Sequence, residues 1–413
     1  MNDFASEMQI CLAGENPLRI GVAISGGSDS TALLVKMANW AVGRGITVFA
    51  ATVDHGLRPE AASEAQQVAG LCATLGIAHM ILPWRGWDGR GNLQDQARQA
   101  RHLLLSDWAH SAEIETIALG HSLNDQAETV MLRLMRGSGV DGLAGMASGV
   151  TRSNIRWIRP LLGTSRQDIR DELTDQGIAW SDDPSNQDIG FERIKVRKLM
   201  RELDISNTGL AETAGRMQRA REALEIETHQ TASAIAEVTL AGDVEFDRVK
   251  FFETPEEIRQ RLLAHALKWV ASNAYRPRLD GLLRVMKSLV AGNKATLAGC
   301  VCEITKSGKI RVSREPASVS GVNCQITEIW DGRWAIYSKD SQPELSIAAL
   351  TENGLAHCPD WRATGLSRSS LLSSPAIWRD KELIAAPAAG LANGWTAELT
   401  QGSAHFFTSI LTH

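Results

Sequence analysis

The chain lacks any apolar run long enough to cross a lipid bilayer. Its first residues, 1–14, also lack the basic stretch followed by an apolar one that marks a secretory signal. The six cysteines among 413 residues are scattered, and no two of them form a C-x-x-C pair. The cysteine spacing therefore implies neither a disulfide framework nor a metal cluster. We expect a protein of the reducing cytoplasm, with no membrane partner. Cys300 and Cys302 would share one side of a strand and pack as small apolar residues.

The chain as a whole also lacks an excess of positive charge, because its formal net charge is −5. Residues 191–314 differ from the rest, with 22 Lys and Arg against 16 Asp and Glu. A polyanionic partner is therefore expected there, although a solvated helical surface would have the same composition. We find no internal repeat, and the length predicts more than one domain.

The most informative motif present is S-G-G-S-D-S at residues 25–30. It follows the apolar run 20–24 and precedes a helical pattern, so its backbone N–H groups and hydroxyls would form an anion cradle at a helix N-terminus. The spacing is neither that of the P-loop nor G-x-G-x-x-G. A plain Ser/Gly turn is the alternative. The motif resembles the pyrophosphate loop of the ATP pyrophosphatases, which split ATP into AMP and pyrophosphate. The residues expected to bind ATP here are Ser25, Gly26, Gly27, Ser28, Asp29 and Ser30.

Strands alternate with helices over residues 18–160. Strands are expected at Ile20–Ile24, Thr47–Val53, His79–Leu82 and Thr116–Leu119, and helices at Asp29–Trp40, Pro59–Leu75, Leu93–Ala109 and Asn124–Met135. This order predicts an α/β fold with a parallel, doubly wound sheet, whose ligands bind at the carboxyl ends of the strands.

The later part of the chain changes character. The pattern is helical from Ile194 to about Val290, and short strands are expected at Leu297–Ile304 and Lys309–Ser313. We therefore predict an α/β domain over residues 1–190, a helical domain over 191–290 and a small β-rich domain over 291–413.

Two predicted strands end in polar motifs. The second ends in Asp54 and His55, for which a capping Asp and a surface His are the simpler alternative. After the fourth come His121, placed to contact phosphate, and then Asp125 and Glu128, three residues apart and therefore on one helix face. The two carboxylates either stabilise the helix N-terminus or hold Mg²⁺ or an ammonium group.

Several motifs occur in one order that resembles the tRNA(Ile)-lysidine synthase family. Beside S-G-G-S-D-S they are Val53–Arg58, the D-Q-A-E-T string inside His121–Thr129, Arg136–Gly139, Arg159–Leu162, Trp180 and Asp183–Asn186. They span residues 20–200. The sequence departs from the family at Ile194, where an Asn usually follows the first Arg of a basic stretch, and residues 291–413 match no motif of the family.

The resemblance implies an enzyme that uses ATP and Mg²⁺ to join L-lysine to the wobble cytidine of a tRNA(Ile) with a CAU anticodon. It implies a catalytic domain at 1–190 and tRNA contacts from 191–290, and it leaves a homodimer open. The ATP site then also includes Asp54, His55, Arg101 and His121. The catalytic residues are Asp29, Asp125, Glu128 and Arg193, with Mg²⁺ on Asp29 and Asp125. The residues expected to bind tRNA or the activated base are Arg98, Arg136, Arg193, Lys195 and Arg197.

Two other functions stay open on the residues alone. One is a nucleotide-binding regulatory module without turnover, and the other is an amide-forming ligase of a small metabolite. The sulfur-transferring tRNA thiolases share the loop, but Cys11 and Cys72 are the only cysteines in residues 1–190 and neither lies beside a site motif. Cysteine-based sulfur transfer is therefore not expected.

Overall fold

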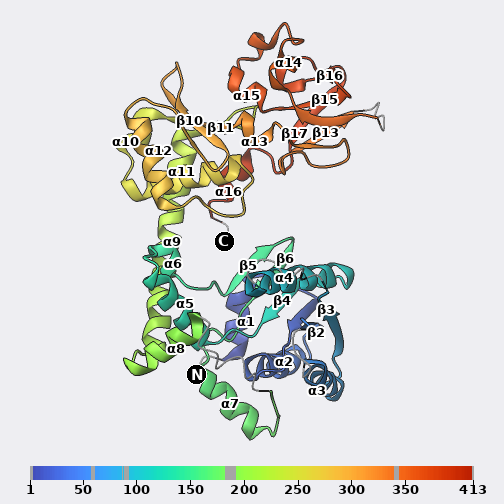
Figure 1. Ribbon diagram of the computed structural model, residues 1–413. Coiled ribbons are helices and arrows are strands. Elements are labelled where there is room, and N and C mark those ends of the chain that lie inside the picture. The colour runs from blue at the N-terminus through green and yellow to red at the C-terminus, as the bar shows by residue number, and fades with distance from the viewer. Residues whose placement is uncertain are drawn as a thin grey trace. The chain divides into compact units, whose positions relative to one another are not determined.

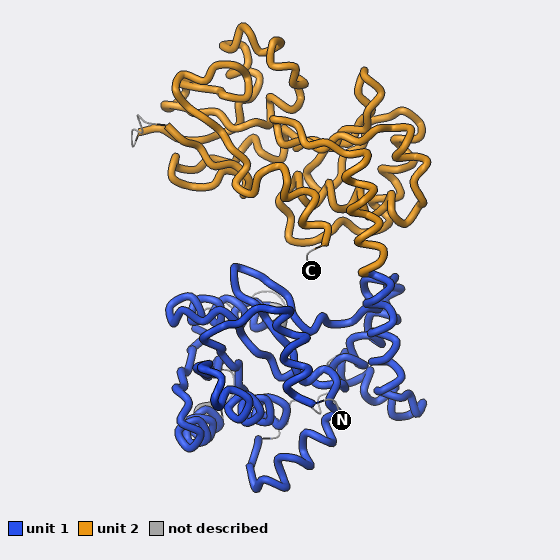
Figure 2. The backbone as a smooth tube through the Cα atoms, turned by 180° about the vertical axis from the view of Figure 1, so that it is seen from behind, with its two compact units in different colours: residues 1–221, 413 blue, residues 222–412 orange. Residues whose placement is uncertain are grey.

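The computed structural model describes residues 3–56, 61–85, 87, 93–181, 192–338 and 344–411. The chain forms two compact units that divide between Arg221 and Glu222, inside the long helix α9 (Asn207–Ile235; Figure 2). This single division differs from the boundaries expected at residues 190 and 290, and the three-domain layout stays a prediction.

Unit 1 is built on a six-stranded sheet with the order β3-β2-β1-β4-β6-β5 (Figure 1). All neighbouring strands are parallel except β5 and β6, which form an antiparallel hairpin at one edge. The predicted parallel α/β sheet is confirmed, whereas the hairpin was not expected. The strands are β1 (Arg19–Ala23), β2 (Thr47–Asp54), β3 (Ala78–Pro83), β4 (Thr116–Leu119), β5 (Gly149–Arg152) and β6 (Ile155–Ile158).

Helices cover both faces of this sheet. Successive residues of β1 point to opposite faces, so Ile20 and Val22 pack with one buried cluster and Ala23 with another. Gly21 faces the indole of Trp108, and a Cβ there would lie 2.7 Å from the ring. The helices of unit 1 are α1 (Phe4–Leu12), α2 (Ser28–Ala41), α3 (Ala61–Thr74), α4 (Leu93–Ser111), α5 (Leu123–Met135), α6 (Val140–Leu143), α7 (Arg166–Asp175), α8 (Glu192–Glu202) and the first part of α9.

Unit 2 begins with an antiparallel sheet of order β7-β8-β11-β10-β9 that shares one core with neighbouring helices. The predicted boundary at residue 290 falls inside this core, because helices before it pack on strands after it. Cys300 and Cys302 are both fully buried there, as the core-packing prediction requires. The elements are β7 (Ala236–Val238), β8 (Val244–Asp247), α10 (Arg248–Glu253), α11 (Glu256–Val270), α12 (Leu279–Val290), β9 (Ala295–Leu297), β10 (Cys300–Ile304), β11 (Lys309–Arg314) and α16 (Ala404–Thr408).

The sequence predicts one strand over residues 297–304, but the structure has two. Ala298 and Gly299 adopt left-handed backbone angles, with φ of 54° and 77°, and this turn separates β9 from β10. Strands β7 and β8 likewise interrupt the stretch from Ile194 to about Val290, which the sequence predicts to be helical. In both places the strands pair with partners distant in the sequence, which local periodicity does not show.

The rest of unit 2 holds two small sheets, of order β12-β14-β15-β16 and β13-β17, so the expected β-rich C-terminal part is confirmed. The elements are α13 (Pro316–Val319), β12 (Asn323–Gln325), β13 (Trp334–Ser338), β14 (Ser346–Ala349), α14 (Thr351–Leu355), α15 (Arg368–Leu372), β15 (Pro375–Arg379), β16 (Glu382–Ala385) and β17 (Trp395–Leu399).

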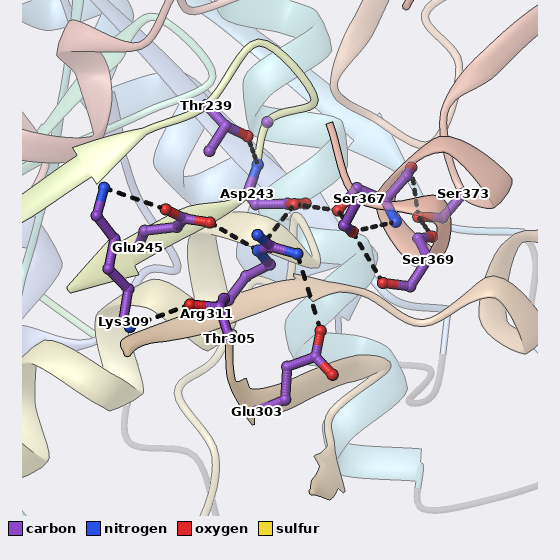
Figure 3. Close-up of polar contacts among 12 residues, drawn as sticks. Thr239, Asp243, Glu245, Glu303, Thr305, Lys309, Arg311, Ser367, Ser369 and Ser373 are labelled. Atoms are coloured by element: carbon purple, nitrogen blue, oxygen red, sulfur yellow. Dashed lines mark hydrogen bonds and ion pairs between the residues drawn. The ribbon is translucent and has the colours of Figure 1, made fainter. Parts of the chain in front are cut away.

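A buried polar network joins helix α15 to the five-stranded sheet of unit 2 (Figure 3). Asp243, directly before β8, accepts a hydrogen bond from the Ser370 hydroxyl of α15. Arg311 of β11 lies 4.0 Å from the Asp243 carboxylate and 2.7 Å from that of Glu245. Burial raises the pKa of Asp243 to about 7, although the Ser370 hydrogen bond and Arg311 oppose the change.

Candidate active site

The S-G-G-S-D-S loop connects β1 to the first turn of α2 at the carboxyl edge of the sheet. Gly26 has a φ of 85°, which favours glycine, and Gly27 is the N-cap of α2. The Ser30 hydroxyl accepts from the Ser25 backbone N–H at 3.1 Å and donates to the Gly27 carbonyl at 3.1 Å. The loop is therefore closed on itself at the positive end of a 14-residue helix, which suits an anion.

The end of β4 lies directly against this loop. A Cβ at Gly120 would lie 2.8 Å from Ser30 Cα and 2.9 Å from the Ser30 backbone nitrogen. On the other side, the Ser181 N–H donates to the Gly26 carbonyl at 2.9 Å. Three segments far apart in the sequence therefore meet at the loop.

The two carboxylates of D-Q-A-E-T lie in the first turns of α5, and both are buried. Asp125 accepts from the backbone N–H and the hydroxyl of its N-cap residue Ser122, at 2.9 and 3.0 Å. Only 6% of Asp125 and 2% of Glu128 is exposed to solvent. A carboxylate at Asp125 alone would serve as a helix cap, but the buried Glu128 makes no cap and needs another partner.

That partner is Arg197 of α8. Its guanidinium donates to both Glu128 oxygens, with Nε–Oε1 at 2.5 Å and Nη2–Oε2 at 3.1 Å. The same Nη2 lies 3.9 Å from Asp125 Oδ1. Arg197 was expected from the sequence to bind tRNA or the activated base, whereas in the structure its guanidinium pairs with the acidic pair.

A second arginine, Arg166 at the start of α7, lies among three carboxylates and was missed by the sequence analysis. Its Nε lies 3.1 Å from Asp29 Oδ2, its Nη2 3.0 Å from Asp125 Oδ1 and its Nη1 3.9 Å from Glu128 Oε1. The one local signal was Ser165, whose hydroxyl accepts from the Asp168 N–H and caps α7. A capping serine predicts where a helix begins. It does not predict which groups the first side chain of that helix, here Arg166, contacts.

The environment moves the pKa values of the neighbouring carboxylates in opposite directions. Burial raises the pKa of Glu128, and the bonds from Arg197 offset this only in part. Burial also acts to raise the pKa of Asp125, but Arg166 and the Ser122 hydrogen bonds outweigh it and hold that pKa below its usual range. One carboxylate is therefore held ionised while its neighbour takes up a proton more readily.

His121 marks a cationic region beside the acidic pair. Burial first, and then the charge of Arg159, lower the pKa of His121 to about 3, with Arg101 and Arg193 acting in the same direction. The imidazole is therefore neutral at physiological pH, and its buried Nδ1 has no hydrogen-bond partner among the described residues. The predicted residues Arg101, His121 and Arg193 thus lie close enough to interact electrostatically, and Arg159 is an addition to the predicted set.

The remaining site residues predicted from the sequence do not share one location. Asp54 and His55 stand at the end of β2, where the Asp54 carboxylate accepts from the Gly56 N–H at 2.9 Å. Arg98 is exposed on α4 and Lys195 on α8. Arg136 is exposed and forms an ion pair with Glu192. The D-P-S-N element lies outside the described residues.

Among the described residues, no three His, Cys, Asp or Glu side chains form a group that by itself would hold a metal ion. Mg²⁺ usually keeps several waters and uses one or two carboxylates together with substrate phosphates. Asp29, which belongs to the pyrophosphate loop, and Asp125 are two such carboxylates, and Arg166 contacts both. No helix in the described ranges combines the length and apolar character needed to cross a membrane.

Comparison with known proteins extends these observations. A family model described as a PP-loop domain matches residues 1–203. A tRNA(Ile)-lysidine synthase of Ruegeria pomeroyi is 42% identical over 417 residues, which cover 100% of this chain and 98% of that protein. One of Wolbachia pipientis wMel is 36% identical and covers 77% of this chain and 76% of its own length. Among solved structures, a U34-tRNA thiolase from Methanococcus maripaludis has a TM-score of 0.46 at 17% identity, over 52% of this chain and 77% of that one.

Proposed function

Because the chain belongs to the tRNA(Ile)-lysidine synthase family, we propose that it joins L-lysine to C2 of the wobble cytidine of a tRNA(Ile) with a CAU anticodon. The reaction uses ATP, adenylates the cytidine and releases AMP and pyrophosphate. Arg166 contacts both the pyrophosphate loop and the buried acidic pair. This observation supports assigning the reaction to the residues named below. The regulatory-module alternative is set aside, because the family consists of enzymes.

The first half of the reaction needs the loop. The C2 oxygen of cytosine is a poor leaving group, and adenylation converts it into AMP. We assign the phosphates of ATP to the N–H groups of Gly26, Gly27 and Ser28 and to the hydroxyls of Ser25 and Ser30. The N-terminus of α2 supports this by placing partial positive charge where charge builds up on the departing pyrophosphate. Asp54, His55, Arg101 and His121 are assigned to the nucleotide.

Mg²⁺ is proposed as the metal that accompanies ATP. Asp29 and Asp125 would hold it with the phosphates, and it would neutralise charge on the pyrophosphate. Arg166, which contacts both carboxylates, holds Asp125 near Asp29 of the loop.

The second half needs an uncharged amine. Free lysine has an ε-ammonium pKa of about 10.4, so the site must remove a proton before the nitrogen attacks C2. We assign the ammonium to Asp125 and Glu128 and the proton to Glu128. Its near-complete burial supports this choice, since a buried carboxylate beside an ammonium favours transfer of the proton.

Recognition of the tRNA is assigned to exposed cations. Arg98, Arg136 and Lys195 are available to phosphates, which provide affinity, while the cytosine itself must be unstacked and held in a pocket. Arg193 is assigned to the activated base, and Arg197 to holding Glu128. Contacts of residues 191–290 with tRNA, a homodimer and a cytoplasmic location stay predictions.

The test is incorporation of labelled L-lysine into a tRNA(Ile) transcript bearing CAU, with ATP and Mg²⁺. A matched transcript carries U at the wobble position. We expect label in the first transcript alone, with one AMP released for each lysine joined. Label in both transcripts, or pyrophosphate release that needs no RNA, would contradict the proposal and favour the small-metabolite ligase.

A further inference from the structure

The guanidinium of Arg166 donates hydrogen bonds to two carboxylates, and its third nitrogen lies 3.9 Å from another. Two carboxylates, Asp125 and Glu128, come from α5, and the third, Asp29, comes from the pyrophosphate loop at the start of α2. A guanidinium is planar and rigid, so its donors have fixed directions. Arg166 therefore sets the distance between the loop carboxylate and the acidic pair.

Arg166 is itself held in place through its backbone. Its N–H donates to Asn124 Oδ1 at 2.9 Å, and the Leu123 N–H donates to the Thr164 carbonyl at 2.9 Å. These bonds join the first turn of α7 to the first turn of α5. Only 25% of the Arg166 side chain is exposed, so solvent and salt screen its ion pairs only in part. The backbone of Arg166 is therefore anchored by contacts within the protein.

The charges around Arg166 do not cancel. Asp29, Asp125 and Glu128 contribute three negative charges, and Arg166 and Arg197 contribute two positive ones. The two guanidiniums therefore offset only part of this negative charge, and the proposed Mg²⁺ and lysine ammonium are the cations that these carboxylates would also bind. Arg166 prevents mutual repulsion of the three carboxylates without filling the array.

From these contacts we infer that Arg166 is a positioning residue that couples the two half-reactions. It holds the carboxylate beside the pyrophosphate loop and the carboxylates that receive the lysine amine in one array, so that the amine meets the adenylated base. This inference rests on the proposed function. It requires the shape of the guanidinium, and a point charge in its place is not enough.

The test compares Arg166→Lys and Arg166→Gln with Lys36→Gln. Lys36 of α2 pairs with Glu172 of α7 at 2.5 Å, so this control breaks another ion pair between the same two helices without touching the carboxylates. Thermal midpoint, kcat and KM for ATP and for lysine are measured on the full chain with the CAU transcript. We expect both Arg166 variants to lose kcat about a hundred-fold, since small misplacements of reacting groups cost that much. KM for ATP should change less than kcat, because the N–H groups and hydroxyls of the loop still bind the phosphates, and the kinetics of Lys36→Gln should stay near wild type.

Two results would overturn the inference. The first is an Arg166→Lys enzyme with wild-type kcat, because charge alone would then be sufficient. The second is a loss in the Arg166 variants that Lys36→Gln reproduces at a similar thermal midpoint, because Arg166 would then only hold α7 in place. A wild-type protein that incorporates no lysine would instead refute the proposed function, so the two failures are distinct.

Discussion

At the scale of single residues, the candidate site contains two neighbouring carboxylates whose pKa values are shifted in opposite directions. Asp125 is held ionised by Arg166 and by its helix cap, whereas burial raises the pKa of Glu128. Pairs of titratable groups moved in opposite directions are typical of sites that bind a charge and transfer a proton. This difference is the reason for proposing Asp125 as the cation ligand and Glu128 as the proton acceptor.

Glu128→Gln should separate the two half-reactions. The amide keeps the size of the side chain but accepts no proton, so we expect lysine transfer to fall about a hundred-fold, a typical contribution of general base catalysis. Adenylation uses the pyrophosphate loop and should stay near wild type, so adenylated tRNA accumulates in a rapid-quench measurement. Glu172→Gln, which also removes a paired carboxylate, is the control. An equal loss in adenylation would place Glu128 in the first half-reaction instead.

At the scale of elements, the site depends on how closely β4 approaches the N-terminus of α2. Gly120 directly follows β4, at a point where a side chain would meet the Ser30 backbone. Backbone atoms cannot move aside as flexible side chains do. The pyrophosphate loop and the acidic pair on α5 are close together partly because this residue has no Cβ.

Gly120→Ala should therefore push α2 away from β4. We expect a loss of stability of about 1–3 kcal/mol, as for other overpacked positions, together with weaker ATP binding. The matched control is Gly70→Ala in α3, where a Cβ meets nothing within 4 Å. That substitution should stabilise the helix by about 0.5–1 kcal/mol. Isothermal titration with ATP and thermal unfolding give both quantities, and unchanged ATP affinity in Gly120→Ala would contradict the expectation.

At the scale of the whole molecule, unit 2 contains a buried carboxyl that makes its stability depend on pH. Ser370, Arg311, Arg333 and Glu245 surround Asp243, whose pKa rises from 3.8 to about 7. The folded state thus binds a proton that the unfolded state releases above pH 3.8. The stabilisation is complete below that pH and is lost as the pH rises toward 7.

Asp243→Asn should remove this dependence. An amide needs no proton to be buried neutral, so we expect the variant to unfold at a higher temperature than wild type at pH 7 and with a flatter pH profile between 4 and 7. Thermal unfolding of the full chain across this range measures both effects. Asp280→Asn, at an exposed position of α12, should follow wild type. A variant that is less stable at every pH would show that the ionised carboxylate is needed by Arg311 and Arg333.

Much of unit 1 is predictable from the sequence because its signals are local. The apolar runs, the two-glycine loop and the three-residue spacing of Asp125 and Glu128 each follow from neighbours in the chain. The β5–β6 hairpin and the split of residues 297–304 into two strands were missed. Strand pairing depends on partners far away in the sequence, and the turn at Ala298 and Gly299 has only a single glycine to mark it.

The sequence by itself determined the α/β fold of unit 1, the pyrophosphate loop and the family resemblance, because these depend on residue types at fixed short spacings. Only the tertiary structure decided which charges pair. Arg197 faces Glu128, and Arg166, 137 residues from Asp29, faces three carboxylates at once. Electrostatic energy depends on distance in space, and folding brings α2, α5, α7 and α8 together in a way that no local pattern specifies.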